Sequence, residues 1–261
     1  MKTTLITGAS SGIGEEFARQ YAARGENLFL VARSEDKLQA LGAELAARHK
    51  IDAQYFALDL SQTDAAQKLF DETARRGLEV ETLINNAGFG GVGGFTSQAR
   101  ERQLNMIDLN IRSLVELTHL YLPLMRERGR GAVINVASVA AFQGVPYFAV
   151  YAATKAFVLS FSEAIAEENS AQGVRVLALC PGATETNFFD AAQAQSPKAR
   201  PMQTSKEVVD IAFAALQGGK SHTVCGWPNR LMIFAERFAP RRVVQKMAAK
   251  TMKGQYGDLA R

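Results

Sequence analysis

The sequence predicts an α/β protein with a doubly wound, mostly parallel β-sheet and helices on both of its faces. Short apolar runs alternate with longer amphipathic stretches from one end of the chain to the other, as in successive βαβ units. The apolar runs lack a polar–apolar alternation, which is typical of strands buried on both faces of a parallel sheet. The chain has 261 residues and no linker, repeat or low-complexity tract, so we expect one domain over residues 1–261.

Seven runs are expected to form strands because they are short, rich in β-formers and bounded by turn residues. They are residues 3–7, 27–32, 53–57, 82–85, 132–137, 174–180 and about 221–225. Helices are expected over about 13–24, 34–49, 61–76, 98–127, 150–170 and 204–217. The two least regular stretches are 88–95 and 184–202. Long connections in compact domains usually carry function, and we expect 184–202 to be a substrate loop.

The composition excludes several classes of protein. Hydrophobic residues make up 47% and charged residues 21% of the chain, the balance of a globular protein and not of collagen or a disordered chain. No apolar run reaches the roughly 20 residues of a membrane span, and the first residues lack the pattern of a signal peptide. Cys180 and Cys225 lie outside any CxxC motif, so we expect reduced thiols, no metal site and a cytoplasmic location.

The positive charge is concentrated in the last part of the chain. The net charge is +4, but the segment 229–261 alone holds eight Lys or Arg and two acids. The remainder is nearly neutral, so we expect no nucleic-acid site there. In 229–261 the apolar residues Leu231, Phe234 and Phe238 precede Pro240, and basic residues are interleaved with further apolar ones. Two interpretations stay open for this amphipathic segment: a helical cover with solvated charges, or contact with a membrane surface.

A glycine-rich turn follows the first expected strand and opens the first expected helix. Its sequence, Thr7–Gly14, reads TGASSGIG. Glycines at such a turn let the backbone approach the pyrophosphate of a dinucleotide, and the helix amino terminus supplies free N–H groups and positive partial charge. The candidate contacts are Gly8, Ser10, Ser11, Gly12, Ile13 and Gly14. The alternative is a plain βα turn.

Two further glycine patterns suggest other readings. Gly8-x-Ser10-x-Gly12 matches the nucleophile elbow of serine hydrolases, but it follows the first strand rather than a later one. None of the histidines, which are His49, His119 and His222, has a local context that indicates a catalytic triad. Gly88-x-Gly90-x-x-Gly93 formally matches a dinucleotide fingerprint, but no acid-bearing second strand follows it. We interpret that stretch as a loop near the ligand.

The order and spacing of these motifs resemble the single-domain short-chain dehydrogenase/reductase family. The resemblance runs from Thr3 to about Thr186. It comprises Thr7–Gly14, Asp59, Asn85-Asn86-Ala87-Gly88, Asn110, Ser138, Tyr151-x-x-x-Lys155, Pro181-Gly182 and Thr186. It implies a seven-stranded Rossmann sheet and NAD(P)-dependent chemistry at an alcohol or carbonyl carbon. The last third of the chain carries little of this signature.

Four residues are candidates for catalysis. Tyr151 and Lys155 are four residues apart in an expected helix and therefore share one face. A nearby lysine cation is expected to lower the tyrosine pKa toward neutral, which suits a general acid and base. Ser138 ends a strand and can donate a hydrogen bond to a substrate oxygen. The resemblance implies that Asn110 holds a water in a proton relay, and that Lys155 also binds the nicotinamide ribose.

The second strand indicates which dinucleotide binds. Where NAD enzymes usually place an acid, the chain has Ala32 followed by Arg33 and Ser34. An arginine can bind the 2′-phosphate of NADP(H), so we expect NADP(H) rather than NAD(H). Ser34 also suits the amino-terminal cap of the next helix. The resemblance gives Asp59 the adenine amino group. It adds Leu60, Asn86, Ala87, Gly88, Tyr151, Lys155, Pro181, Gly182, Thr184 and Thr186 to the cofactor contacts.

The expected substrate is a small-molecule ligand, an apolar carbonyl compound or its secondary alcohol. Aromatic and apolar residues flank the chemical motifs: Phe89, Phe142, Val145, Phe148, Phe188 and Phe189. Each could equally be a core residue. The alternatives to an NADP(H)-dependent oxidoreductase are a cofactor-sensing regulator without turnover and, third, a serine hydrolase. The resemblance also implies a homodimer or homotetramer through helices 98–127 and 150–170, where Leu104, Ile107, Ile111 and Leu114 are expected to share an apolar face.

Overall fold

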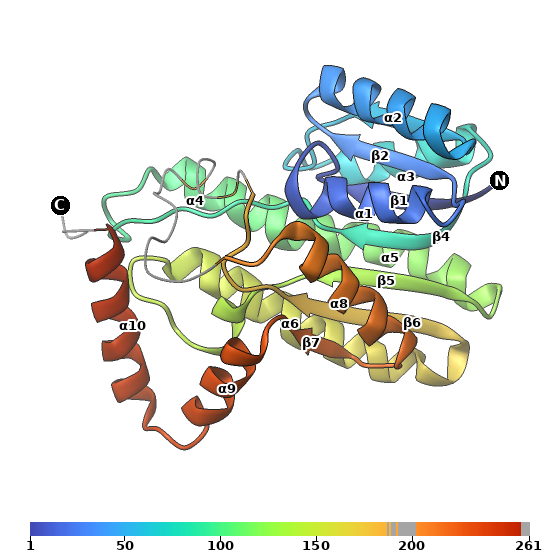
Figure 1. Cartoon of the computed structure of the whole chain (residues 1–261). Coiled ribbons are helices and arrows are strands. Elements are labelled where there is room, and N and C mark those ends of the chain that lie inside the picture. The colour runs from blue at the N-terminus through green and yellow to red at the C-terminus, as the bar shows by residue number, and fades with distance from the viewer. Residues whose placement is uncertain (187, 189–191, 193–201, 257–261) are drawn as a thin grey trace.

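A seven-stranded, all-parallel sheet forms the centre of the molecule (Figure 1). The computed structural model describes residues 1–186, 188, 192 and 202–256. The strands are β1 (Lys2–Thr7), β2 (Leu28–Ala32), β3 (Ala53–Ala57), β4 (Glu79–Asn85), β5 (Gly131–Val136), β6 (Val174–Cys180) and β7 (His222–Val224). They lie in the order β3-β2-β1-β4-β5-β6-β7, so the chain changes direction across the sheet between β1 and β4. This doubly wound topology confirms the predicted fold class.

Helices cover both faces of the sheet because successive strand residues point to opposite sides. Leu28 and Leu30 of β2 belong to a core that also contains residues of α1 (Gly12–Ala22), α2 (Glu35–His49) and α8 (Ser205–Gln217). Phe29 and Val31 belong to a second core, built with α3 (Ala65–Arg75), α5 (Ser113–Glu127) and α6 (Ala149–Asn169). The strand sequences therefore lack polar–apolar alternation because both faces of the sheet are covered by apolar cores.

The expected single helix over 98–127 is wrong in one respect. α4 (Arg100–Ile107) and α5 are joined by a π-helical turn, η1 (Asp108–Arg112). This turn changes the rotational phase between the two helices. Leu104 and Ile107 are 46% and 39% exposed, whereas Leu114 is 5% exposed, so these residues do not share the one face that a regular helix would give them. Ser113 Oγ donates to the Leu109 carbonyl oxygen across the turn at 2.7 Å.

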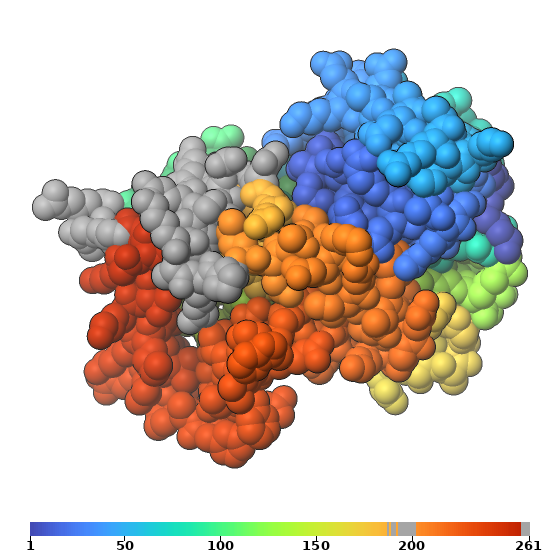
Figure 2. Space-filling view, in the orientation of Figure 1, coloured from blue at the N-terminus to red at the C-terminus, as the bar shows by residue number. Residues whose placement is uncertain are grey.

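The segment after β7 forms two helices, α9 (Trp227–Glu236) and α10 (Arg241–Tyr256), which project from one end of the body (Figures 1 and 2). The predicted proline break holds: Pro240 lies between the helices, and its carbonyl oxygen accepts from the Val243 N–H at 2.8 Å. Ile233 anchors α9 to a third apolar core that includes Val224 of β7. The outer residues of both helices remain exposed.

The helix α6 has a strongly apolar composition. α6, continued to Gln172, has the length and hydropathy of a membrane span, which no other helix in the described ranges has. One face of it packs into the protein interior. Val158 is fully buried, and Ser162 Oγ accepts a hydrogen bond from Asn135 of β5 at 2.9 Å. The helix is thus a core element that carries Tyr151 and Lys155 at its first turns.

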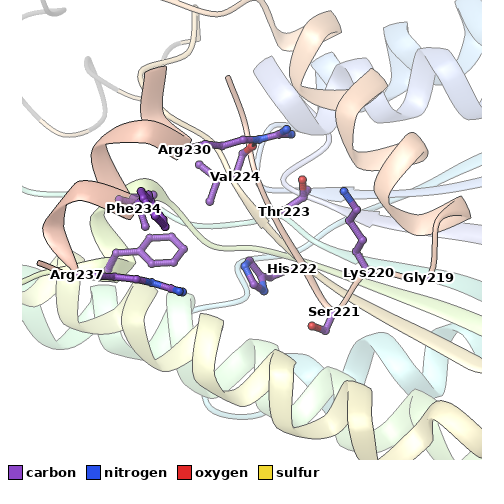
Figure 3. Close-up of a pocket in the computed structure, with 11 residues that line it drawn as sticks. Gly219, Lys220, Ser221, His222, Thr223, Val224, Arg230, Phe234 and Arg237 are labelled. Atoms are coloured by element: carbon purple, nitrogen blue, oxygen red, sulfur yellow. Dashed lines mark hydrogen bonds between the residues drawn. The ribbon is translucent and has the colours of Figure 1, made fainter. Parts of the chain in front are cut away.

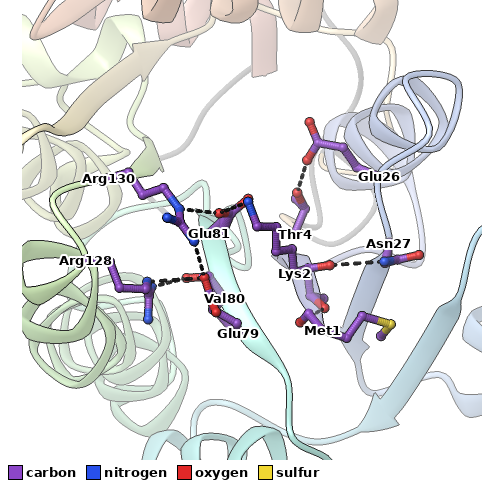
Figure 4. A network of polar contacts seen from close by, with 11 residues as sticks. Met1, Lys2, Thr4, Glu26, Asn27, Glu79, Val80, Glu81, Arg128 and Arg130 are labelled. Carbon is purple, nitrogen blue, oxygen red and sulfur yellow. Dashed lines mark hydrogen bonds and ion pairs between the residues drawn. The ribbon is translucent and has the colours of Figure 1, made fainter.

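Charged side chains tie together the amino ends of the strands (Figure 4). Glu81 of β4 contacts Lys2 at 3.1 Å and Arg130 at 2.7 Å, and Arg130 also reaches Glu79 at 2.9 Å. Exposed pairs of this kind contribute little individually, but here they form a network between β1, β4 and the segment before β5. The opposite, carboxyl edge of the sheet is left for the loops that carry the sequence motifs.

Candidate active site

The carboxyl edge of the sheet brings the candidate residues together. Because all strands are parallel, the loops after β1 to β6 emerge on the same side. These loops carry Gly8–Gly14, Arg33, Asp59 and Leu60, Asn86–Gly88, Ser138, and Pro181, Gly182, Thr184 and Thr186 in that strand order. Tyr151, Lys155 and Asn110 reach the same edge from helices. The gathering of these residues follows directly from the topology.

The glycine turn is locked onto the end of β4. Asn86 Nδ2 donates to the Thr7 carbonyl oxygen at 2.9 Å and the Gly8 carbonyl oxygen at 3.2 Å. Thr7 Oγ1 accepts from the Asn86 and Ala87 N–H groups at 2.9 and 3.0 Å. A Cβ at Gly14 would collide with the Gly8 carbonyl and the Asn86 amide. Thr7 is a positioning residue that we did not single out from the motif.

Two of the turn glycines have a backbone conformation that disfavours side chains. Gly8 has φ of 65° and Gly12 has φ of 60°. A Cβ at Gly12 would lie 2.8 Å from Thr186 Cγ2, so the first turn and the segment after β6 are in direct contact. Ser11 occupies the amino-terminal cap position of α1 without a capping hydrogen bond from its side chain. The turn therefore offers a cradle of backbone N–H groups, with Ser10 and Ile13 only partly buried beside it.

The end of β2 presents a positive charge to solvent. Arg33 is exposed, and its guanidinium makes no hydrogen bond or ion pair within the described part of the chain. Burial would raise the pKa of Asp59, but the Ser61 N–H and hydroxyl, together with the charge of Arg33, lower it. Ser34 holds the cap position of α2 as expected, yet its hydroxyl makes no capping hydrogen bond. Leu60 is only 4% exposed and belongs to the second core.

Ser138 and Tyr151 form a buried pair of hydroxyl groups. Ser138 precedes the 3₁₀ turn η2 (Val139–Phe142), and its hydroxyl accepts from the Ala140 N–H at 3.1 Å. That turn holds the serine side chain at the end of β5, where its hydroxyl lowers the pKa of Tyr151. Both side chains are nearly inaccessible, at 8% and 7% exposure. The pair thus presents two adjacent hydroxyl groups at a dry position.

The electrostatics of Tyr151 and Lys155 differ from the sequence expectation. Burial raises the pKa of Tyr151 to about 12, against the smaller lowering effect of the Ser138 hydrogen bond. The charge of Lys155 is not among the causes that lower the Tyr151 pKa, and burial lowers the pKa of the Lys155 ammonium itself to about 8. Lys155 Nζ donates to the Val136 carbonyl oxygen at 2.7 Å and lies 5.8 Å from the Tyr151 ring centroid. The expected lowering of the tyrosine pKa is therefore wrong for this structure.

The lysine pKa predicts a pH-dependent stability. Between pH 8 and 10.5 the unfolded chain keeps the Lys155 proton that the folded chain has lost, so the cost of burying the cation disappears as pH rises. From pH 7 to pH 10 the parent protein should gain about 2–3 kcal/mol of unfolding free energy relative to Lys155→Met. Urea unfolding of both proteins at several pH values measures this difference. A constant difference would contradict the lowered pKa.

Asn110 sits within the π-helical turn. Its Oδ1 accepts from the Phe89 N–H at 3.1 Å, while its Nδ2 donates to the Phe89 carbonyl oxygen at 3.0 Å and to Thr154 Oγ1 at 3.1 Å. Thr154 Oγ1 in turn donates to the Tyr151 carbonyl oxygen at 2.7 Å. Asn110 is therefore a link between the loop after β4 and the helix that carries Tyr151. Neither the π turn nor Thr154 was expected from the sequence.

The aromatic candidates divide into two groups. Phe148 stacks on Tyr151 with ring centroids 4.3 Å apart, and the Phe188 ring lies 5.3 Å from Tyr151. Phe89 borders the same loop, with the Arg102 guanidinium 5.3 Å from its ring. Phe142 and Val145 instead line cavities that, by their described lining residues, do not include Tyr151. Phe189 lies outside the described residues.

Comparison with known proteins agrees with this geometry. The family model for short chain dehydrogenases matches residues 2–197. Sulfoacetaldehyde reductase 2 of Chromohalobacter salexigens is 39% identical over 70% of this chain and 73% of its own. Very-long-chain 3-oxoacyl-CoA reductase-A of Danio rerio is 29% identical over 100% of this chain and 81% of its own.

A solved structure extends the likeness to three dimensions. The short-chain dehydrogenase from Sphingobium yanoikuyae in complex with NADPH superposes with a TM-score of 0.83 at 31% identity, covering 94% of this chain and 95% of the other. The match therefore includes the seven-stranded sheet and the edge at which the motifs meet. This chain belongs to the short-chain dehydrogenase family of oxidoreductases, which act on CH–OH and C=O groups.

Proposed function

We propose that the protein is an NADP(H)-dependent oxidoreductase that interconverts an apolar carbonyl compound and its secondary alcohol. The observation that carries this proposal is the buried Ser138–Tyr151 pair beneath the Phe148 and Phe188 rings. Two hydroxyl groups can bind one substrate oxygen there, and the rings favour an apolar body around it. The alternative of a serine hydrolase loses support because Ser10 belongs to the glycine turn and not to this pair.

The residues at the sheet edge fit a dinucleotide. The turn at Gly8–Gly14 is a cradle that side chains would fill, which suits close approach of a pyrophosphate. Arg33 is exposed and unpaired among the described residues, with no acid at Ala32, so the 2′-phosphate of NADP(H) would find a charge-assisted partner. The related enzyme from Sphingobium yanoikuyae carries NADPH, which supports the same preference here.

The remaining cofactor contacts are assigned by their place at the edge. Asp59 would accept from the adenine amino group, with Leu60 beside it. Asn86, Ala87 and Gly88 would border the central part of the cofactor. Tyr151 and Lys155 would face the nicotinamide ribose, and Pro181, Gly182, Thr184 and Thr186 would close over the nicotinamide end. The role of 184–202 as a substrate loop stays a prediction, because most of that stretch lies outside the described residues. The cytoplasmic location also stays a prediction.

The chain's own residues supply proton transfer and charge stabilisation. The nicotinamide, when bound, exchanges a hydride with the substrate carbon. In reduction, the Tyr151 hydroxyl gives its proton to the carbonyl oxygen while Ser138 donates a hydrogen bond to the same atom. A pKa of about 12 keeps Tyr151 protonated at neutral pH, as a proton donor must be. Lys155, whose pKa of about 8 leaves it mostly protonated at neutral pH, would bind the nicotinamide ribose, and Asn110 would hold a water that returns the proton.

The assay is the loss of NADPH absorbance with a panel of carbonyl compounds. Long-chain aliphatic, aromatic and steroid ketones should be reduced, with kcat/KM rising with apolar size. A small sulfonated aldehyde tests the chemistry named for the relative from Chromohalobacter salexigens. Preference for that anion would overturn the apolar assignment. NADPH binding without turnover of any carbonyl compound would favour a cofactor-sensing regulator instead.

Exposed apolar residues on three helices support a homo-oligomer. Leu104 and Ile107 of α4, Leu124 of α5 and Phe157 of α6 are between 38% and 46% exposed. Apolar faces of this kind are usually covered by a second subunit in a two-fold symmetric contact. We expect a dimer or tetramer at micromolar concentration, measured by light scattering. A monomer would contradict this, and Phe157→Glu should shift the population toward smaller species.

A further inference from the structure

The outer side of α9 carries a row of exposed apolar residues. Trp227, Leu231, Phe234 and Phe238 follow one another at helical spacing and are 74%, 58%, 57% and 76% exposed. Ile233, on the opposite side of the helix, is 8% exposed and anchors it to the body. Val243 and Met247 continue the exposed apolar residues onto α10, at 46% and 65%. We call these six residues, with the basic residues described next, the tail surface.

The charge of the tail surface is positive and not neutralised. Arg230, Arg237, Arg241, Arg242, Lys246 and Lys250 make no ion pair with any residue that the structure describes. Glu236 is the only acid in α9 and α10. Its carboxylate is partly buried against Gln143, on the inner side. Arg230, Arg237 and Arg241 also line the cavities beside these helices, whereas Arg242, Lys246 and Lys250 line neither, so the exposed apolar row is accompanied by cations and by no acid of α9 or α10 on the outer side.

We propose that the tail surface docks onto an anionic lipid bilayer. Helices that lie in a membrane interface combine an apolar face with Lys and Arg, and their affinity adds apolar burial to attraction for anionic headgroups. Tryptophan is favoured at the membrane–water interface because its ring is apolar and its N–H is polar. A second copy of this chain is a poor occupant, since a two-fold contact would place the same cations against each other. The charge thus selects an anionic partner.

Docking at this surface would place the membrane beside two cavities, one of which borders the start of α6. The inner sides of α9 and α10 border two cavities that share Phe142. One, of about 630 Å³, lies between β7 and α9 (Figure 3), and the other, of about 400 Å³, lies between the start of α6 and α10. Lys253 of α10 also lies 5.5 Å from the ring of Tyr147, just before the helix that carries Tyr151. If the proposed function holds, an apolar substrate dissolved in the bilayer would reach the enzyme from this side.

Trp227 reports docking directly because it is the only tryptophan in the chain. Vesicles of phosphatidylcholine with phosphatidylglycerol should shift its emission to shorter wavelength, and brominated lipids should quench it. Pure phosphatidylcholine vesicles should produce a much weaker effect. Raising the salt from 0.1 to 1 M shortens the Debye length from about 10 to 3 Å and should release most of the protein. This readout requires neither substrate nor turnover, so its failure is distinct from failure of the proposed function.

Variants distinguish docking through the tail surface from a general attraction of the positively charged protein to anionic vesicles. Replacing Arg242, Lys246 and Lys250 by Gln should lower the vesicle partition coefficient about a hundredfold in co-sedimentation. A control with Arg48, Lys50 and Arg126 replaced by Gln loses the same charge elsewhere on the surface and should bind nearly as the parent does. Leu231→Gln with Phe238→Gln should lower partitioning at least about tenfold. Unchanged NADPH affinity in each variant shows that the fold is intact.

Three results would overturn the proposal. An equal loss of vesicle binding in the control variant and in the α10 variant would mean that binding depends only on the net charge of the protein. An emission shift that grows with protein concentration, without vesicles, would mean that a second copy covers the surface. A shift produced by an acidic protein or polyglutamate, with none from anionic vesicles, would mean that the partner is a protein.

Discussion

Replacing Tyr151 by Phe is expected to lower kcat by about a hundred- to ten-thousand-fold while the Kd for NADPH stays nearly constant. The substitution removes only the Tyr151 hydroxyl, which pairs with that of Ser138, so the proton donor is lost. The ring remains, and with it the stacking on Phe148 at 4.3 Å. Steady-state kinetics and NADPH fluorescence titration measure the two quantities separately.

Two variants serve as controls for this result. Tyr147→Phe removes the nearest alternative phenol and should leave kcat within about twofold of the parent value. Lys155→Ala should harm both turnover and NADPH binding, because the lysine is expected to act on the tyrosine and the ribose. If Tyr151→Phe keeps substantial activity, Tyr151 is not the proton donor.

Replacing Arg33 by Ala should weaken NADPH binding by about 10- to 150-fold. The lost contact between the guanidinium and the 2′-phosphate is charge-assisted and worth roughly 1.5–3 kcal/mol. NADH has no phosphate at that position, so its affinity should hardly change. Lys37→Ala is a matched control that removes a cation from the adjacent helix. The measurement is kcat/KM for both cofactors with one substrate.

Adding an acid should reverse the cofactor preference. Ala32→Asp together with Arg33→Ala places a carboxylate where the 2′-phosphate would lie and offers the NADH ribose an acceptor. A parent enzyme that already prefers NADH would show that the end of β2 was misinterpreted. An equal fall for both cofactors in Arg33→Ala would make Arg33 a structural residue.

The sheet could be predicted because its signal is local. Strands such as Leu28–Ala32 and Val174–Cys180 are apolar on both faces, and the motifs that end them fix their direction. Once the strands are parallel, residues as distant as Gly8 and Ser138 must meet at one edge. The sequence was therefore sufficient for the fold class and for the expectation that the candidate residues meet at one edge of the sheet.

The features that were missed depend on tertiary contacts. The pKa of Tyr151 is set by what buries it, and no spacing rule gives that burial. The bonds of Thr7 to the Asn86 and Ala87 backbone join segments 79 and 80 residues apart. The π turn leaves no mark in composition, because its extra residue is chosen by the packing on either side. These are contacts that only the folded chain brings together.

The π turn makes this region sensitive to the length of the chain rather than to its composition. Deleting one residue within Asp108–Arg112 would remove the extra residue that the turn accommodates and restore regular helical winding, with α4 and α5 in nearly the rotational phase that they have now. Leu104 and Ile107 would keep their place relative to Leu114, but the wide turn from which Asn110 makes its two bonds to the Phe89 backbone would be lost. A one-residue gap at this turn, in an alignment with any relative, would thus signify a rebuilt link between the loop after β4 and α6, with the exposed apolar residues of α4 kept in place, even where every aligned side chain is identical.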